Sequence, residues 1–192
     1  MLVVNKPAGL LTVPGRGEDK ADCLITRVQK TYSDALIVHR LDMSTSGLVL
    51  LARGVEMQRQ LSKMFRERKV QKRYIALVSG RLLNETGEID LPLMTDWPNR
   101  PRQKVDMLDG KPSQTRYRLI GFANDVSRVE LEPVTGRSHQ LRLHMAAIGH
   151  PIMGDELYGG EQVERLMLHA QSLSFVHPLR GEWLHLECAA IF

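Results

Sequence analysis

The residue whose neighbours most favour chemistry is an aspartate, Asp42. It ends the run His-Arg-Leu-Asp, two positions after Arg40, and three hydroxyl side chains follow it at Ser44, Thr45 and Ser46. A carboxylate beside an arginine is favoured in its ionised form, because the opposite charges attract. That form can accept a proton or attack an electrophile. A structural aspartate that caps a turn is the alternative, and the spacing alone leaves both interpretations open.

A second polar turn, Thr-Gly-Arg-Ser at residues 135–138, opens a predicted helix. Ser138 is a suitable N-cap, and Gly149 is a suitable end for this helix. Arg137 in the turn is placed to reach a carboxylate from another loop, since its guanidinium can pair bidentately with an aspartate. His139 and His144 are five residues apart and fall on different helix faces, so the sequence does not favour zinc and we expect no metal.

Positive charge is densest between residues 63 and 73, where six cations accompany the single acid Glu67. Cations near a helix C-terminus are ordinary on a solvated surface. They can also contact RNA phosphates, and Arg66 and Lys72 are the candidates here. Lys72 begins a predicted strand over residues 72–78 that also contains Tyr74. A tyrosine in a strand is usually a half-buried packing residue.

An aromatic residue among cations and prolines lies further along, in residues 96–104 (DWPNRPRQK). Such a loop is stiff and basic, and Trp97 with Arg100 can stack on unpaired bases of RNA. A surface loop anchored by a buried Trp97 explains the pattern equally well.

The remaining pattern predicts the elements that must position these residues. Residues 48–52 form a short apolar run typical of a buried strand. The other predicted strands are residues 1–5, an antiparallel pair at 115–120 and 126–131, and a final pair at 167–176 and 182–187. Helices are predicted at 22–32, which Asp22 can cap, and at 54–68. Residues 80–110 are rich in turns. This is an α+β pattern with many antiparallel strands.

Composition sets limits on the class of protein. The chain has 192 residues, 43% of them hydrophobic, and a net charge of +4. This size predicts a single domain with a sizeable core, and the charge is compatible with RNA. Two distant cysteines, Cys23 and Cys188, fit reduced thiols. No apolar run reaches the roughly 18 residues of a membrane span, so we expect a soluble, cytoplasmic protein. Because the chain begins inside a strand, we expect a preceding segment to be missing.

Four separated motifs together resemble the RluA family of pseudouridine synthases. They are Asn-Lys-Pro-x-Gly at residues 5–9, His-Arg-Leu-Asp with Thr-Ser-Gly at 39–47, Thr-Gly-Arg-x-His-Gln-Leu-Arg-x-His at 135–144, and Leu-His-Ala at 168–170. The segments Lys-x-Tyr-x-Ala at 72–76 and Gly-His-Pro-Ile-x-Gly-Asp-x-x-Tyr at 149–158 fit as well. The resemblance covers residues 5 to about 189.

This resemblance implies a fold and a reaction. The fold is a single α+β catalytic domain over residues 1–192, with a long, bent, mostly antiparallel mixed sheet flanked by helices and loops. No separate N-terminal RNA-binding module is visible. The reaction isomerises uridine to pseudouridine in RNA, without cofactor or metal. The resemblance makes Asp42 the catalytic residue and Arg137 its partner, while Tyr74 stacks on the uracil and Leu168 lines an apolar floor. The predicted RNA contacts are Arg40, Arg66, Lys72, Trp97, Arg100, His139 and Arg142.

Within the family, the run Val-Pro-Gly-Arg at residues 13–16 and the loop around Trp97 look most like a dual-specificity branch. Its members modify one uridine in the tRNA anticodon arm and another in a large-subunit rRNA hairpin. The alternatives are a branch that acts on rRNA only and a non-catalytic RNA-binding protein on the same fold. A hydrolase that uses Asp42 with a histidine is disfavoured, because no activating residue has a suitable context. We expect a monomer.

Overall fold

The computed structural model describes residues 1–15, 17 and 21–192. The chain divides into two compact units, one of Met1–Lys72 with Ala170–Ile191 and the other of Arg73–His169 with Phe192. Strands β4 (Gln71–Ser79) and β10 (Leu168–Val176) each contribute residues to both units. Each unit has its own cluster of buried apolar side chains.

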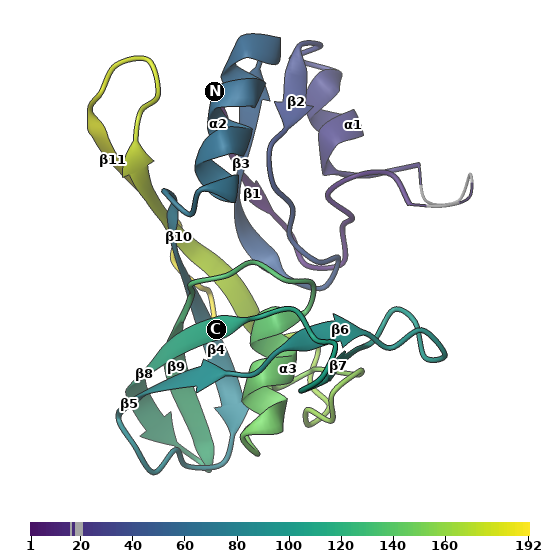
Figure 1. The fold of residues 1–192 in the computed structure, drawn as a ribbon, viewed down its shortest axis with the longest axis vertical. Helices are drawn as coiled ribbons and strands as arrows, with labels where there is room; N and C mark the ends of the chain where they lie inside the picture. Colours follow the sequence, from purple (N-terminus) through teal and green to yellow (C-terminus); the bar gives the residue numbers. More distant parts are fainter. Residues whose placement is uncertain (16, 18–20) are drawn as a thin grey trace. The chain divides into compact units, whose positions relative to one another are not determined.

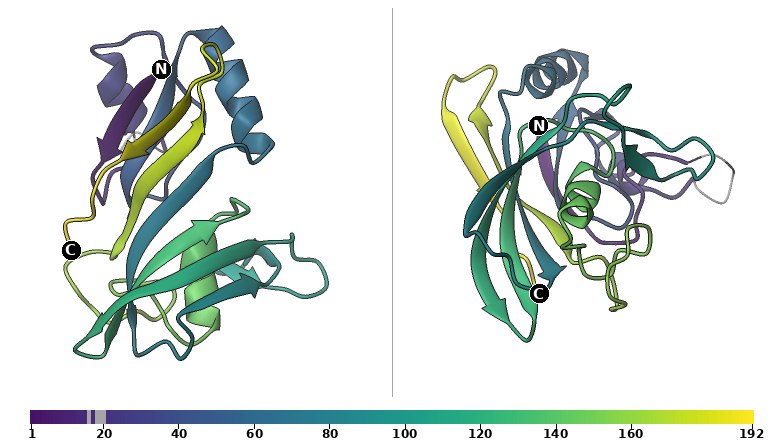
Figure 2. Two further views of the ribbon diagram at one scale, coloured as in Figure 1. Left: turned by 90° about the vertical axis from the view of Figure 1, so that its left-hand side faces the viewer. Right: turned by 60° about the horizontal axis from the view of Figure 1, so that its bottom comes forward.

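The first unit is built around strand β3 (Ser46–Arg53), on which seven of eight residues are buried. This strand pairs antiparallel with β1 (Leu2–Lys6) and with β2 (Ala35–Ile37). On its other side it neighbours β10, which pairs antiparallel with β11 (Trp183–Glu187) to form a long hairpin (Figures 1 and 2). An apolar run without alternation is what a strand buried on both faces requires, which is why the pattern at 48–52 predicted it correctly.

Two helices complete this unit, α1 (Leu24–Gln29) and α2 (Val55–Arg66). The apolar stripe of α2 packs toward the sheet, where its buried Leu61 joins a cluster with Leu50 of β3 and Phe175 of β10. Helix α2 lies beside β3 in Figure 1. The loop from β2 to β3, which contains Asp42, therefore connects two strands whose positions are fixed by a buried core.

The second unit contains a sheet with the strand order β4-β9-β8-β5. Strands β8 (Gln114–Ala123) and β9 (Val126–Pro133) form a long antiparallel hairpin, and β5 (Thr86–Asp90) pairs with β8. Helix α3 (Gln140–Ala147) lies beside this sheet (Figure 1). Its Leu141 and Met145 join the buried apolar cluster of this unit. A small separate hairpin is formed by β6 (Leu93–Thr95) and β7 (Gln103–Val105).

Most predicted elements are confirmed, including the α+β class and the largely antiparallel pairing. Three details were wrong. The turn-rich stretch 80–110 contains the short strands β5, β6 and β7. Strand β5 pairs with the distant strand β8, while β6 and β7 form a local hairpin. Helix α1 is capped by Cys23, while Asp22 pairs with Arg27. Helix α3 is capped by His139 instead of Ser138, with a left-handed backbone at φ 54°.

The structure also bears on the predictions for the two cysteines and for membrane spans. Cys23 and Cys188 are free thiols. In the described part of the chain, no helix is long and apolar enough to cross a membrane. Arg16, which belongs to the run used to choose a branch of the family, lies outside the described residues.

Candidate active site

The loop that carries Asp42 is hydrogen-bonded to the N-terminal segment of the chain. Asp42 is half-buried, and its carbonyl oxygen accepts a hydrogen bond from the backbone N–H of Thr45 at 3.2 Å. The next carbonyl, that of Met43, accepts from the N–H of Gly9 at 2.9 Å. The Thr12 hydroxyl is hydrogen-bonded to the backbone of Leu41, accepting from its N–H and donating to its carbonyl. These bonds fix the backbone on both sides of the carboxylate.

Lys6 adds further hydrogen bonds between the N-terminal turn and the Asp42 loop. Its side chain is fully buried, and its ammonium donates to three carbonyl oxygens, those of Pro7 at 3.0 Å, Leu10 at 2.7 Å and Met43 at 3.0 Å. Burial lowers the pKa of Lys6 to about 8, and the negative charge of Asp42 acts in the opposite direction. An ammonium has three donors, and each has a partner here. A buried cation thus lies close enough to Asp42 for their mutual attraction to offset part of the burial penalty.

His39 anchors the other end of the same loop. Its Nε2 accepts a hydrogen bond from the backbone N–H of Leu50 in β3 at 2.8 Å, and its ring stacks on Phe65 of α2 with centroids 4.3 Å apart. Burial lowers the pKa of His39 to about 3, and the positive charge of Lys72 lowers it further. The imidazole is therefore neutral with its proton on Nδ1, and it acts as a fixed acceptor instead of an acid or base.

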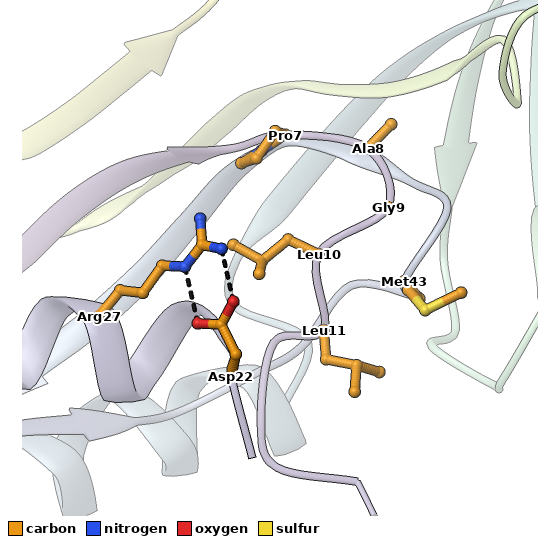
Figure 3. Close-up of a pocket in the computed structure, with 8 residues that line it drawn as sticks. All are labelled: Pro7, Ala8, Gly9, Leu10, Leu11, Asp22, Arg27 and Met43. Carbon is orange, nitrogen blue, oxygen red and sulfur yellow. Dashed lines mark hydrogen bonds and ion pairs between the residues drawn. The ribbon is translucent and has the colours of Figure 1, made fainter. Parts of the chain in front are cut away.

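A shallow hollow of about 460 Å³ opens beside this loop (Figure 3). Met43, the residue after Asp42, is one of the residues that line it. Asp22 and Arg27 stand at its edge, joined by two hydrogen bonds of 2.8 and 2.6 Å. The full lining is Pro7, Ala8, Gly9, Leu10, Leu11, Asp22, Arg27 and Met43.

The predicted cationic residues of this unit lie on or near its surface. Arg40 is exposed in the loop that carries Asp42, and Arg66 is exposed at the last residue of α2. Lys72 is half-buried in β4. Two neighbouring lysines, Lys63 and Lys69, pair with Glu67 at the exposed end of α2, which reduces the net charge of that surface.

In the second unit, Tyr74 and Leu168 share one environment. Tyr74 is half-buried in β4 opposite Leu131 of β9, and it packs against the cluster of buried side chains that includes Leu168. Leu168, the first residue of β10, is itself buried. The two residues therefore belong to the same buried apolar cluster.

Arg137 lies in the turn between β9 and α3, and its side chain is exposed. Its Nε makes one long hydrogen bond, 3.4 Å, to the carbonyl of Pro112. The Nδ1 atom of the adjoining His139 lies 2.9 Å from the hydroxyl of Tyr158, within hydrogen-bonding distance, and the same hydroxyl accepts from the backbone N–H of Gln103. Tyr158 thereby ties the turn to strand β7.

The loop between β6 and β7 presents Trp97 and Arg100 together. The guanidinium of Arg100 lies 4.6 Å from the centre of the Trp97 ring, and Trp97 is 64% exposed. The alternative of a buried tryptophan that anchors the loop is therefore wrong. An exposed indole paired with a guanidinium is a surface suited to stacking on bases.

Comparison with known proteins decides the family. The family model for RNA pseudouridylate synthase matches residues 1–147. The chain belongs to the RNA pseudouridylate synthase family. The dual-specificity RNA pseudouridine synthase RluA of Yersinia pestis is 51% identical over 197 residues, covering all of this chain and 96% of that protein. The protein of the same name from Escherichia coli K12 is 48% identical and 90% covered.

Solved structures agree with this family assignment. Human RNA pseudouridylate synthase domain containing 1 matches with a TM-score of 0.81 and 30% identity, over 98% of this chain and 79% of that one. Human RNA pseudouridylate synthase domain containing 4 matches with a TM-score of 0.78 and 25% identity, over 97% and 84% of the two chains. The chain is thus an RNA pseudouridine synthase, an isomerase that acts on RNA, as its motifs predicted.

One residue predicted to contact RNA is buried in this synthase. Arg142 is buried in α3, and its Nε and Nη2 each donate to a carboxylate oxygen of Asp155 at 2.7 Å. The partner that allows its burial, Asp155, is distant in sequence, so the motif gave no sign of this environment. We therefore replace the predicted RNA contact of Arg142 with a structural role, since a buried bidentate pair is costly to break.

Two polar residues of this synthase were missed from the sequence. Lys6 was noticed only as part of the Asn-Lys-Pro-x-Gly motif, and Gln140 only as part of the motif around Arg137. Both are buried. Lys6 hydrogen-bonds the carbonyl of Met43, next to Asp42, and Gln140 hydrogen-bonds the backbone N–H of Arg137 itself. The usable signal was a long polar residue inside a motif and next to apolar neighbours. Within the described residues, no group of three or more His, Cys, Asp or Glu side chains is arranged to hold a metal ion.

Proposed function

We propose that this pseudouridine synthase has dual specificity, for a uridine in a tRNA anticodon arm and another in a large-subunit rRNA hairpin. The N-glycosidic bond breaks, the detached uracil turns, and C5 is joined to ribose C1′. N1 gains a proton, and the proton that C5 carried is lost to solvent. Support comes from the motif pattern and from two relatives that span the whole chain and are named dual-specificity RNA pseudouridine synthases.

The observation that carries the assignment of Asp42 is the way its loop is held. Lys6 donates to the Met43 carbonyl of the loop and to the Pro7 and Leu10 carbonyls of the N-terminal turn. His39, near the start of the loop, accepts from the N–H of Leu50 in β3. A carboxylate on a backbone fixed in this way is preorganised, so little reorganisation is needed at the moment of reaction. Asp42 acts at the sugar, either by attacking C1′ or by removing a ribose proton to give a glycal.

Three further residues complete the proposed site. Arg137 pairs with the Asp42 carboxylate and orients it, a task that suits the fork of donors on its guanidinium. Tyr74 stacks on the uracil, and Leu168 provides an apolar floor that keeps water out. The shared apolar environment of Tyr74 and Leu168 supports this assignment. The target base must leave its stack, which costs a few kcal/mol and is cheapest in a loop.

The proposed RNA contacts are of two kinds. Arg40, Arg66, Lys72 and His139 neutralise or bond phosphates and thereby contribute affinity. Trp97 and Arg100 stack on an unpaired base of the substrate loop, as their exposed pair suggests. We further propose that the enzyme works as a monomer in the cytoplasm, where tRNA and rRNA are found, and that the reaction uses no cofactor.

The test is release of tritium from RNA labelled at uridine C5, because the reaction expels the hydrogen at that position. An anticodon stem-loop and an rRNA hairpin serve as substrates, and RNA binding is measured in parallel. Wild type is compared with Asp42→Asn. A matched control is Asp34→Asn, which removes the same charge from a surface residue paired with Arg53.

We expect release from both RNAs by wild type and by Asp34→Asn, and none by Asp42→Asn although it still binds RNA. Release from one RNA only would refute the dual specificity and leave the catalytic role of Asp42 intact. Full activity of Asp42→Asn would refute that role.

A further inference from the structure

Gln140, the first residue of α3, has a side chain that folds back over the turn carrying Arg137. Its Oε1 accepts from the backbone N–H of Arg137 at 3.0 Å and from the hydroxyl of Thr135 at 2.7 Å. Its Nε2 donates to the carbonyl of Gln114 at 2.9 Å and to the hydroxyl of Thr115 at 3.0 Å. Gln140 is buried, and these four bonds use both ends of its amide.

The network continues through His144, one turn further along α3. His144 is fully buried, with Nε2 3.0 Å from the carbonyl of Leu91 and Nδ1 2.9 Å from the hydroxyl of Thr115. A carbonyl only accepts, so Nε2 carries the proton. Burial lowers the pKa of His144, which keeps the ring neutral and makes Nδ1 an acceptor from Thr115.

Every hydrogen bond in this network then has a defined direction. His144 donates to Leu91, Thr115 donates to His144, and Gln140 donates to Thr115. The carbonyl end of the Gln140 amide is thereby turned toward Arg137. Rotating the amide by half a turn would place its NH₂ group against the N–H of Arg137 and its oxygen against the carbonyl of Gln114. Such a fully satisfied buried network holds one arrangement, because any alternative leaves a buried group unpaired.

We propose that Gln140 is a positioning residue that acts through Arg137, with Thr115 and His144 fixing its orientation. This inference rests on the proposed role of Arg137 as the partner of Asp42. The turn needs such a support for a physical reason. His139 at the N-cap has a left-handed backbone, and the N–H of Arg137 lies before the helix, so Gln140 supplies the acceptor for it from inside the first turn. The side chain of Arg137 is exposed, so the residue is fixed mainly through hydrogen bonds to its backbone.

The experiment compares Gln140→Met, Arg137→Met and the double variant in single-turnover tritium release at saturating RNA. Met has nearly the length of Gln and removes both ends of the amide. Ser127→Ala is the matched control. Ser127 is also fully buried and hydrogen-bonds the backbone of Gly80 and Leu82, at the opposite end of β9. Unfolding is measured for all variants, and exchange of the Arg137 amide hydrogen is followed in wild type and Gln140→Met.

We expect Gln140→Met to slow the single-turnover step roughly tenfold, as loss of one orienting hydrogen bond predicts, with RNA affinity nearly unchanged. Exchange of the Arg137 amide should accelerate. In the Arg137→Met background, Gln140→Met should have little further effect on the rate. Ser127→Ala should keep the wild-type rate even if it is equally destabilised.

The other outcomes separate the two hypotheses. A slow Arg137→Met enzyme with a normal Gln140→Met enzyme would overturn the role of Gln140 alone. The same conclusion follows if Gln140→Met slows the double variant as much as it slows wild type. A normal Arg137→Met enzyme would overturn the proposed role of Arg137, and the positioning role of Gln140 with it.

Discussion

Replacing Gly47 with alanine should destabilise the fold through a steric clash at the start of β3. Gly47 belongs to the Thr-Ser-Gly part of the signature, five residues after Asp42. Its φ is +114°, a conformation that residues with a side chain rarely adopt. A Cβ at this position would lie 2.3 Å from the carbonyl oxygen and 2.5 Å from the nitrogen of Ala170 in β10. Both atoms belong to the backbone, so no side chain can rotate away.

The magnitude follows from two contributions. A residue with a side chain at a backbone angle of this kind costs about 1–3 kcal/mol. The contact with Ala170 must also lengthen from 2.3 Å to an ordinary van der Waals distance, which moves β3 and β10 apart locally. Overpacking of this kind typically costs about 1–3 kcal/mol more. The sum, about 2–6 kcal/mol, is a large part of the roughly 5–15 kcal/mol by which such proteins are stable.

Gly9→Ala is the matched control, because Gly9 has φ +83° and nothing within 4 Å of the added Cβ. It isolates the backbone contribution and carries the same gain from a less flexible unfolded chain. Urea unfolding followed by circular dichroism measures the free energy of unfolding of both variants. Gly47→Ala should lose at least about 1 kcal/mol more than Gly9→Ala. Equal losses would refute the steric argument and would show that the strand accommodates the methyl group.

Two other predictions concern pH and the buried ion pair. Since His39 titrates near pH 3 when folded and near 6.5 when unfolded, protons favour the unfolded chain below pH 6.5, and up to about 2 kcal/mol of stability is lost between pH 7.5 and pH 5. Between pH 7.5 and pH 5, the free energy of unfolding measured in urea should fall less for His39→Gln than for wild type. An equal fall would contradict this prediction. Arg142→Met should cost about 3–5 kcal/mol, because it leaves Asp155 buried without its partner. A double-mutant cycle with Asp155→Asn should be non-additive by more than about 1 kcal/mol, and additive losses would mean that the pair is not coupled.

Local chemistry explains what could be predicted around Asp42. A short apolar run such as residues 48–52, with glycines at positions 47 and 54, favours a buried strand, and the structure has one there. The apolar stripe of α2 determined in the same way which of its faces would be buried. The motifs supplied the identities of the candidate catalytic residues and the family, which the comparisons confirmed.

The supporting residues depended on contacts distant in sequence. Nothing near Lys6 in the sequence indicates that its ammonium will bind the carbonyl of Met43, 37 residues away, because the three-dimensional path of two loops decides that contact. Arg142 illustrates the reverse error. A charged residue in a basic motif was expected at the surface, and only Asp155, brought close by the fold, makes its burial possible.

The amino-acid sequence by itself therefore determined the family, the α+β class, the main strands and helices, and the residues proposed for the chemistry, since each depends on local pattern or on a short motif. The tertiary structure decided which buried polar side chains hydrogen-bond the backbone near those residues. Lys6 near the Asp42 loop and Gln140 near the Arg137 turn are buried and hydrogen-bond backbone groups from other segments, those of Met43 and Gln114. A buried polar side chain is stable only where the whole fold supplies its partners, and that condition cannot be read from neighbouring residues.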